Sequence, residues 1–357
     1  MIERLFLDGV DAKPAGQAVA QQSDFVANSA ADKAQSPLPI VQFAKTGAKV
    51  TLDFAVVQFM PVMCADAVVI FHDRGADWLL YWKHSKNWRC EMTGMLRPAS
   101  VAGLFYPAGE SALRSLVSGM LADAADPPVL PRRPRALVVP HAGLVYSGPV
   151  AAVAYRLLQR ELADCGWRRI VLLGPNHRVP LLGMAVPDEA DWKTPLGIVE
   201  LDRTLLAELR QHFPLAVRPD AHLPEHSLEV QLPFIQTIAA ELRILPVLVG
   251  PTDANVVADL IECCWRDEQT LVLISSDLSH YHPWAEAQRL DSITSDMICS
   301  QDPHLGSEQA CGCHALNGLL LAARRQGYRI DCLSRLTSGD TAGDKQQVVG
   351  YGAYVCY

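Results

Sequence analysis

Several features that would assign this chain of 357 residues to a specialised class of protein are missing from its sequence. Basic residues are not in excess: 31 Lys and Arg stand against 39 Asp and Glu, which gives a formal net charge of −8 at pH 7. That balance excludes a broad cationic surface for nucleic-acid phosphates or anionic lipid. No repeat of fixed period is present either, and a composition with 50% hydrophobic residues is that of an ordinary globular protein.

Long apolar segments are also missing. The longest, residues 54–71, is interrupted by Gln58, Pro61 and Asp66, so no stretch of about 20 apolar residues is available to span a membrane. The first residues, MIERLFLDGVDAKP, lack the basic and then apolar order of a secretory signal. The 10 cysteines form no CxxC pair and no regular framework, which predicts free thiols in a reducing compartment. We therefore expect a cytoplasmic protein with neither a membrane nor a nucleic-acid partner.

The composition of the chain changes near residue 95. Residues 1 to about 50 are rich in Ala, Gln, Ser and Asp, and they bury too little apolar surface to offset their ordering entropy. Residues 51–95 are more apolar and carry three tryptophans, but their strand-like runs are too few for a core of their own. We predict that residues 1–95 are a partly disordered N-terminal extension of unknown function and that residues 96–357 form the main domain.

From about residue 96 onward, short apolar segments alternate with amphipathic ones. The sequence predicts strands over 136–140, 170–173, 244–249, 271–274 and in the terminal VVGYGAYV, and helices over 149–163, 227–242, 253–265, 284–299 and 315–325. Continuous apolar strands that alternate with helices are typical of a mostly parallel sheet covered by helices on both faces. We therefore predict an α/β fold.

Three histidines follow three of the predicted strands. His141 follows ALVVP, His177 follows IVLLGPN, and His280 follows LVLISSDLS. In open α/β sheets, ligands bind in a crevice beyond the carboxyl ends of the strands. A single histidine in a loop is commonly a surface or capping residue, but three at equivalent positions predict one shared crevice.

Two further motifs carry reactive side chains. Asp277 and His280 are a candidate catalytic pair, because a spacing of three in a strand-to-helix turn lets a carboxylate orient an imidazole for general acid–base catalysis; a capping Asp beside a surface His is the alternative. Cys311 directly precedes a predicted helix, whose dipole favours the thiolate, so it can be a metal ligand or a nucleophile. We expect Cys313 to be a buried structural thiol, and His314 to lie at the pocket.

The motif PEHSLEVQLPF places Glu225 and His226 at the start of another predicted helix. A carboxylate there complements the helix dipole. His226 either faces solvent together with Glu229 or, like Glu225, lines the pocket. The segment Asp191–Pro195 is either a substrate wall or a packed turn.

The order of these motifs resembles that of the Memo family. PHAGLVYSG, GPNH, KTPLG, EHSLEVQLPF, ILPVLVG, SSDLSHY, the CG-x-H element and a closing GYGAY follow one another as in that family, starting near Arg97. Bacterial members are often labelled as the B protein of the AmmeMemoRadiSam system. The resemblance implies a fold similar to class III non-haem iron extradiol dioxygenases. Residues 1–95 lie outside it.

The resemblance implies a site of two histidines and one cysteine. His141, His177 and Cys311 match the metal ligands, His280 matches the histidine opposite the metal, and Asp277 matches its neighbouring acid. The dioxygenases use a carboxylate where Cys311 stands here. Because a thiolate favours copper or zinc and a His/His/carboxylate set suits Fe(II), we expect iron or copper, with zinc as a further candidate.

Three functions follow from such a site. In the first, a metal-dependent oxidoreductase keeps open metal positions for O₂ or substrate while His280 moves protons; a redox-inert metal would support hydrolysis instead. The second is a thiol hydrolase with Cys311 as nucleophile, a histidine base and Asp277. The third is a non-catalytic scaffold that binds a metal or a peptide. The name of the bacterial system implies a radical SAM partner. The sequence does not tell which small molecule or peptide is bound, nor what the oligomeric state is.

Overall fold

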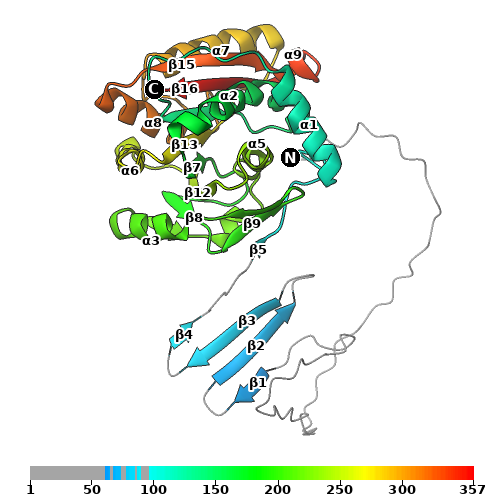
Figure 1. Cartoon of the computed structure of the whole chain (residues 1–357), viewed down its shortest axis with the longest axis vertical. Coiled ribbons are helices and arrows are strands. Elements are labelled where there is room, and N and C mark those ends of the chain that lie inside the picture. Colours follow the sequence, from blue (N-terminus) through cyan, green and yellow to red (C-terminus); the bar gives the residue numbers. More distant parts are fainter. Residues whose placement is uncertain (1–60, 65–66, 74–77, 85–86, 90–95) are drawn as a thin grey trace, which may run out of the picture. The chain divides into compact units, whose positions relative to one another are not determined.

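The computed structural model describes residues 61–64, 67–73, 78–84, 87–89 and 96–357 (Figure 1). The prediction that residues 1–50 are mobile therefore lies outside the described residues. Four strands pair antiparallel in chain order to form a separate small sheet: β1 (Pro61–Cys64), β2 (Ala67–Asp73), β3 (Trp78–His84) and β4 (Asn87–Arg89). The strand-like runs expected between residues 51 and 95 thus pair with one another.

A nine-stranded sheet organises the rest, in the order β11-β8-β12-β7-β13-β6-β16-β14, with β15 paired to β16. Its four central strands run parallel: β12 (Arg243–Val249), β7 (Arg169–Gly174), β13 (Thr270–Ser275) and β6 (Ala136–Val139). The outer strands are β8 (Met184–Val186), β11 (Leu215–Val217), β14 (His280–His282), β15 (Ile330–Thr337) and β16 (Val348–Cys356). The predicted parallel sheet is confirmed at its centre, whereas β16 pairs antiparallel with β6, β14 and β15, and β8 pairs antiparallel with β12.

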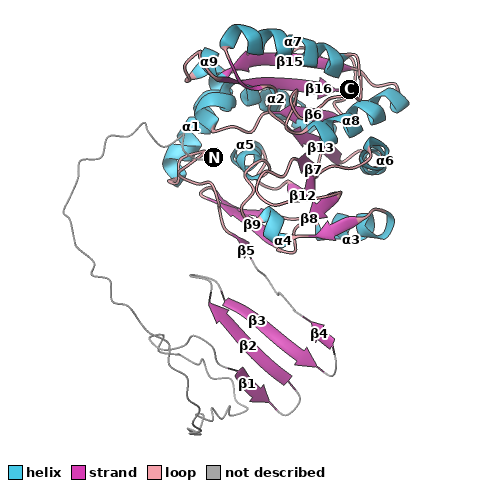
Figure 2. Ribbon diagram, turned by 180° about the vertical axis from the view of Figure 1, so that it is seen from behind, coloured by secondary structure: helices cyan, strands magenta, loops and turns pink. Residues whose placement is uncertain are grey.

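Helices cover both faces of this sheet (Figure 2). Alternate residues of one central strand serve opposite cores: Leu137 and Val139 pack with α1, α2 and α5, whereas Ala136 and Val138 pack with α3, α6 and α8. This alternation explains why the central strands read as continuous apolar runs. The helices are α1 (Glu110–Asp123), α2 (Leu144–Cys165), α3 (Arg203–His212), α4 (Pro219–His222), α5 (Leu232–Ile238), α6 (Ala254–Trp265), α7 (Trp284–Cys299), α8 (Cys313–Gln326) and α9 (Ser338–Thr341).

Some predicted boundaries are wrong. Helix α2 begins at Leu144, five residues earlier than expected, with Pro149 inside it. The helix predicted over 227–242 is a 3₁₀ turn, η1 (Glu229–Gln231), followed by the short α5. Residues 191–195 are not a plain loop, because β9 (Asp191–Thr194) pairs with β10 (Gly197–Glu200) and with β5 (Leu96–Arg97).

Two expectations about the chain as a whole concern spans and thiols. In the part that the structure describes, no helix combines the length and the apolar character that crossing a membrane requires. Within residues 96–357 the eight cysteines are all unpaired, as predicted: Cys165, Cys263, Cys264, Cys299, Cys311, Cys313, Cys332 and Cys356.

Candidate metal centre

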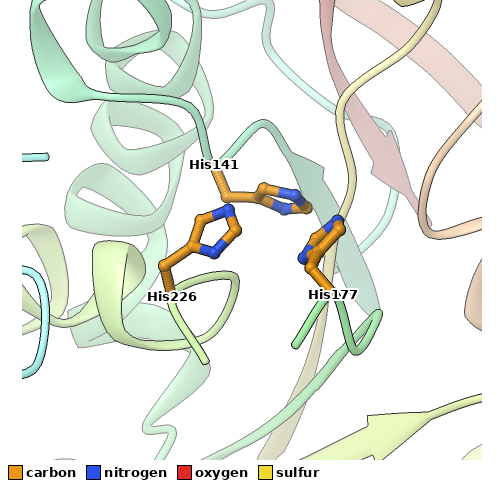
Figure 3. Close-up of side chains that lie close together, drawn as sticks. All are labelled: His141, His177 and His226. Atoms are coloured by element: carbon orange, nitrogen blue, oxygen red, sulfur yellow. The ribbon is translucent and has the colours of Figure 1, made fainter. Parts of the chain in front are cut away.

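Three histidines meet at the carboxyl end of the central strands (Figure 3). One ring nitrogen from each of His141, His177 and His226 lies within 4.8 Å of the others. The ring centroids of His141 lie 5.3 Å from those of His177 and 5.5 Å from those of His226, and the rings of His177 and His226 stack at 4.7 Å. Such convergence of imidazoles is typical of a metal centre.

The sheet order explains how two of these histidines meet. His141 follows β6 and His177 follows β7, and β13 lies between these two strands. Their loops therefore flank the end of β13, where Ser275 is the last residue of the strand. His141 and His177 thus lie together beyond the strand ends, whereas His280, the third histidine predicted to join them, is not part of the cluster.

His141 is held on several sides and is only 1% exposed. Its backbone N–H donates to Asp277 Oδ1 at 2.7 Å, and its Nδ1 lies 2.9 Å from Ser275 Oγ. Its Nε2 lies 3.4 Å from Cys311 Sγ. Burial, together with the charge of His177, holds the pKa of His141 well below its ordinary value. The ring is therefore neutral, which is the state in which imidazole binds a metal.

The Glu225 carboxylate orients the other two histidines. Its Oε2 accepts the backbone N–H of His177 at 2.6 Å, and its Oε1 lies 2.9 Å from His177 Nδ1. Oε1 also accepts the backbone N–H groups of His226 and Ser227 at 3.0 and 2.9 Å. Burial alone would raise the pKa of Glu225, but the hydrogen bond and charge of His177 hold it well below its usual range. The ionised carboxylate accepts the Nδ1 proton of His177 and leaves its Nε2 free.

His226 is a full member of the cluster, so the expectation that it faces solvent with Glu229 is wrong. Glu229 is buried and pairs with Arg97 at 2.6 Å. The ring of His226 packs 4.5 Å from that of Phe105, and burial lowers its pKa to about 3. Its buried Nδ1 lies 3.2 Å from Glu225 Oε1 without the geometry of a hydrogen bond.

Arg97 anchors the segment that carries Glu225 and His226. Its Nε donates to the carbonyl of His222 at 2.9 Å, and its Nη2 donates to the carbonyl of Glu225 at 2.8 Å. The Glu229 carboxylate that pairs with Arg97 also accepts the Tyr106 hydroxyl at 2.6 Å. The position of His226 therefore depends on a buried arginine that lies 129 positions earlier in the chain.

Cys311 lies at the edge of the cluster. Its Sγ accepts the backbone N–H of Asp277 at 3.2 Å, and its own N–H donates to the carbonyl of Asp277 at 3.3 Å. Burial and the charge of Asp277 raise the pKa of the Cys311 thiol well above its ordinary value. This direction is opposite to the one that a thiol nucleophile requires. It suits a thiol that ionises only when a cation is near it.

Asp277 contacts a different histidine from the one expected. Its carboxylate bonds to the backbone of His141, and its Oδ2 lies 4.0 Å from His141 Nε2. Burial raises the pKa of Asp277, while the charge of His280 opposes that shift. His280 itself is half-buried on β14, where it pairs with Val349 of β16. Asp277 and His280 thus lie near each other, but the direct contacts of the carboxylate are to His141.

The remaining candidates lie on α8. Cys313 is buried in the core formed with α6, which confirms a structural thiol. His314 is half-buried in the first turn of α8, and burial lowers its pKa. Among the described residues, His314 makes no hydrogen bond, ion pair or ring contact with His141, His177 or His226.

The residues present fit a transition-metal ion. The donors are neutral imidazoles and an adjacent thiol, and the buried Nδ1 of His226 has no hydrogen-bond partner among the described residues. Imidazole suits zinc, copper and iron, and a thiolate adds preference for copper and zinc. Such a set can hold one ion while groups beside it hold or move protons.

Comparisons with known proteins match the part of the chain that carries these histidines. The family model described as Memo-like protein matches residues 97–355. Among curated proteins, a MEMO1 family protein of Sulfolobus acidocaldarius is 35% identical over 280 residues, which cover 72% of this chain and 98% of that protein. A MEMO1 family protein of Archaeoglobus fulgidus is 35% identical over 274 residues, covering 73% and 99%, and one of Methanothermobacter thermautotrophicus is 36% identical over 279 residues, covering 72% and 99%. An uncharacterized protein of Escherichia coli K12 is a distant structural neighbour, with a TM-score of 0.40 and 15% identity over 61% of this chain and 99% of that one.

Proposed function

The chain belongs to the family of Memo-like proteins, and from that premise we propose that it is a metal-dependent oxidoreductase with one transition-metal ion in this crevice. The observation that supports it best is the convergence of nitrogens from His141, His177 and His226 within 4.8 Å. All three imidazoles lie within the matched part of the chain.

The proposed ligands are His141 and His177, completed by either Cys311 or His226. The family resemblance implies Cys311 as the third ligand, and the 3.4 Å contact between its Sγ and His141 Nε2 supports that assignment. The stacking of His226 on His177 supports a second candidate for the same role. A set that mixes imidazole and thiolate favours copper or iron for redox chemistry, with zinc as the redox-inert competitor.

A bound metal would supply Lewis acidity and, for iron or copper, electron transfer to or from a substrate. The protein's own groups then have separate tasks. Glu225 and Ser275 hold the rings of His177 and His141 in place. His280, half-buried beside Asp277, is the group placed to hold or move a proton.

Element analysis tests the metal proposal. Protein purified without oxygen should contain close to one equivalent of iron, copper or zinc, and His141→Ala should remove most of it. His226→Ala and Cys311→Ser, compared in the same titration, identify the third ligand by the larger loss of affinity. His304→Ala is the matched control, since its side chain is 80% exposed and pairs with Asp302. Absence of stoichiometric metal, or equal metal in His141→Ala, would contradict the proposal.

The oxidoreductase assignment needs a separate readout. Electron paramagnetic resonance of the native protein, recorded before and after exposure to oxygen, should report a metal that changes oxidation state. A native content of zinc alone would contradict redox chemistry and would leave hydrolysis as the reaction class. No observation favours the thiol hydrolase, because the pKa of Cys311 is raised.

The radical SAM partner and the cytoplasmic location also remain proposals. The first rests on the family resemblance, and the second is supported by the free cysteines of the described residues. Pull-down with the radical SAM protein of the same system, compared between the native chain and His177→Ala, tests the partner. Equal capture of both proteins would support a scaffold role independent of the metal centre.

A further inference from the structure

We propose that Ser275, supported by Gln231, is a positioning residue that fixes His141 as the tautomer protonated on Nδ1. Its Nε2 lone pair then faces the metal centre. The inference deepens the proposed function, on which its metal-binding consequence rests, but the tautomer itself is a property of the metal-free protein. Gln231, Ser275, Ser227 and His141 are buried, and their hydrogen bonds allow only one position for each shared proton.

The amide of Gln231 has a single possible orientation. Its Nε2 lies 2.9 Å from the carbonyl oxygen of Pro140, and a carbonyl oxygen can only accept. The group at that position must therefore be the NH₂. Its Oε1 accordingly faces the Tyr155 hydroxyl, which donates to it at 2.8 Å. Because the amide is 1% exposed, water does not offer a second arrangement.

The hydroxyl of Ser275 is determined next. Gln231 Nε2 donates to Ser275 Oγ at 2.9 Å, so that oxygen already accepts one proton. Ser275 Oγ also lies 2.6 Å from the carbonyl oxygen of Ser227, another group that only accepts. The single hydroxyl proton of Ser275 therefore points at Ser227.

His141 is left with one role. Its Nδ1 lies 2.9 Å from Ser275 Oγ, whose only proton is engaged elsewhere, so Nδ1 must be the donor. A neutral imidazole with its proton on Nδ1 carries its lone pair on Nε2. That Nε2 is the atom next to Cys311 Sγ, at 3.4 Å, and to Asp277 Oδ2, at 4.0 Å. The free lone pair thus lies on the side of the proposed ligands.

Removal of Ser275 should change the tautomer. Ser275→Ala deletes the acceptor of the Nδ1 proton, so both tautomers of His141 become available. Gln231→Met deletes one donor to Ser275 Oγ but leaves the Ser227 carbonyl that accepts the hydroxyl proton, so the Nδ1–H tautomer should persist. Groups that orient a metal-ligating histidine typically contribute 10- to 100-fold to metal affinity, and we expect a loss in that range for Ser275→Ala and a smaller loss for Gln231→Met.

The test uses the metal-free protein, labelled with ¹⁵N in histidine, and long-range proton–nitrogen NMR correlations. The His141 signals are assigned by their absence from His141→Gln. We expect the native ring to show the Nδ1–H pattern and Ser275→Ala to show a mixture of tautomers. Thr294→Val is the control, because it removes a buried hydroxyl that donates to the carbonyl of Leu290 on α7, away from the crevice. It should leave the His141 signals unchanged.

An Nε2–H pattern for native His141 would overturn the inference. So would a Ser275→Ala protein with an unchanged tautomer. The first outcome needs no Ser275 variant, so it decides the inference even if Ser275→Ala does not fold. These outcomes are independent of the proposed function. A protein that shows the Nδ1–H pattern but binds no metal would contradict the proposed function alone. A protein that binds metal but shows the Nε2–H pattern before metal is added would contradict this inference alone.

Discussion

Burial and neighbouring charges set the ionisation state of each side chain in the metal centre. Burial keeps His141 and His226 neutral and keeps the Cys311 thiol protonated, while Glu225 stays ionised through its hydrogen bonds and the charge of His177. The centre is therefore a group of neutral donors beside the fixed negative charge of Glu225. A cation would be attracted to it and would favour ionisation of the thiol.

Glu225→Gln tests the role of that fixed charge. An amide cannot accept all four hydrogen bonds, so we expect metal affinity to fall about 10- to 100-fold and the free energy of unfolding at pH 7 to fall by about 1–3 kcal/mol. The pKa of Glu225 is lowered on folding, so its contribution is present above the unfolded value of about 4.3 and is lost as the pH falls below it. Metal titration measures the loss of affinity, and urea denaturation between pH 7 and pH 3 measures the free energy of unfolding and its pH dependence.

The difference in stability between the native chain and Glu225→Gln should narrow below about pH 4.3, the ordinary glutamate value. Glu110→Gln is the control, since Glu110 forms only an exposed pair with Arg114. A difference that stays constant over the whole range would contradict the assigned direction of the pKa.

Cys311 should react slowly with alkylating agents in the metal-free protein. Because the pKa of its thiol is raised, little thiolate is present at pH 7, and we expect alkylation by iodoacetamide to be at least about tenfold slower than for an ordinary thiol. Mass spectrometry of the peptide that contains Cys311 gives the rate, with an unstructured cysteine peptide in the same reaction as the reference for an ordinary thiol. Rapid labelling of Cys311 would revive the thiol hydrolase.

Elements that approach closely also shape the site. Gly350 of β16 exchanges hydrogen bonds with the loop before β14, since its N–H donates to Ser279 and its carbonyl accepts from Leu278. A Cβ at Gly350 would lie 1.9 Å from Oδ2 of the buried Asp291 on α7. The close approach of strand and helix at this point therefore requires glycine, and it sets the position of the loop that carries Asp277 and His280.

Gly350→Ala should push β16 away from α7. We expect a loss of about 1–3 kcal/mol in the free energy of unfolding, the usual cost of overpacking, together with weaker metal binding because the adjoining loop moves. Gly119→Ala is the matched control: a Cβ at that exposed position of α1 meets nothing within 4 Å. It should be neutral or stabilising by up to about 1 kcal/mol. Urea denaturation and metal titration of both variants decide; equal stability would contradict the close contact.

The short strand β5 contributes through Arg97. Arg97→Met leaves the Glu229 carboxylate buried without its partner, so we expect a loss of about 3–5 kcal/mol in the free energy of unfolding. The double variant Arg97→Met/Glu229→Gln should recover part of that loss, because the uncompensated charge is gone. Denaturant titration of the two single variants and the double variant measures the coupling. Strictly additive effects would show that the pair does not act as a unit.

At the scale of the whole molecule, the metal and the fold should stabilise each other. The clustered histidines come from three segments separated by 36 and 49 residues of chain, from His141 to His177 and from His177 to His226, so the unfolded chain holds an ion poorly. Metal at 100 times its dissociation constant should therefore add about 2.7 kcal/mol to the free energy of unfolding. Thermal melts with metal and with chelator measure the shift, which His141→Ala should abolish. A melting temperature indifferent to metal would contradict a native centre.

Sequence reasoning found the parts of the site that local order determines. His141 and His177 were predictable because each follows a buried parallel strand, and such strands end at one edge. His226 follows no strand, and its place depends on Arg97, which lies 129 positions earlier in the chain, so the local motif left its pocket role as one of two alternatives. The contact of Asp277 with His141 was missed for a similar reason, since the spacing in the sequence favoured His280.

The fold shows the same division. The central strands and α6 and α7 were predictable from apolar runs and helical spacing, whereas β8, β10 and β11 have only three or four residues each and depend on their neighbours. The helix predicted over 227–242 begins only at Leu232, because the chain before it forms η1, where Gln231 and Glu229 make buried contacts.

Arg97 is also the first residue of the match to the family, and relatives from archaea are covered almost completely by the part of the chain that follows. The anchor of the third histidine therefore lies at the first position of the matched domain. A truncation that stops short of Arg97 would leave this anchor intact, whereas one that removes Arg97 would leave the buried Glu229 carboxylate without its cationic partner.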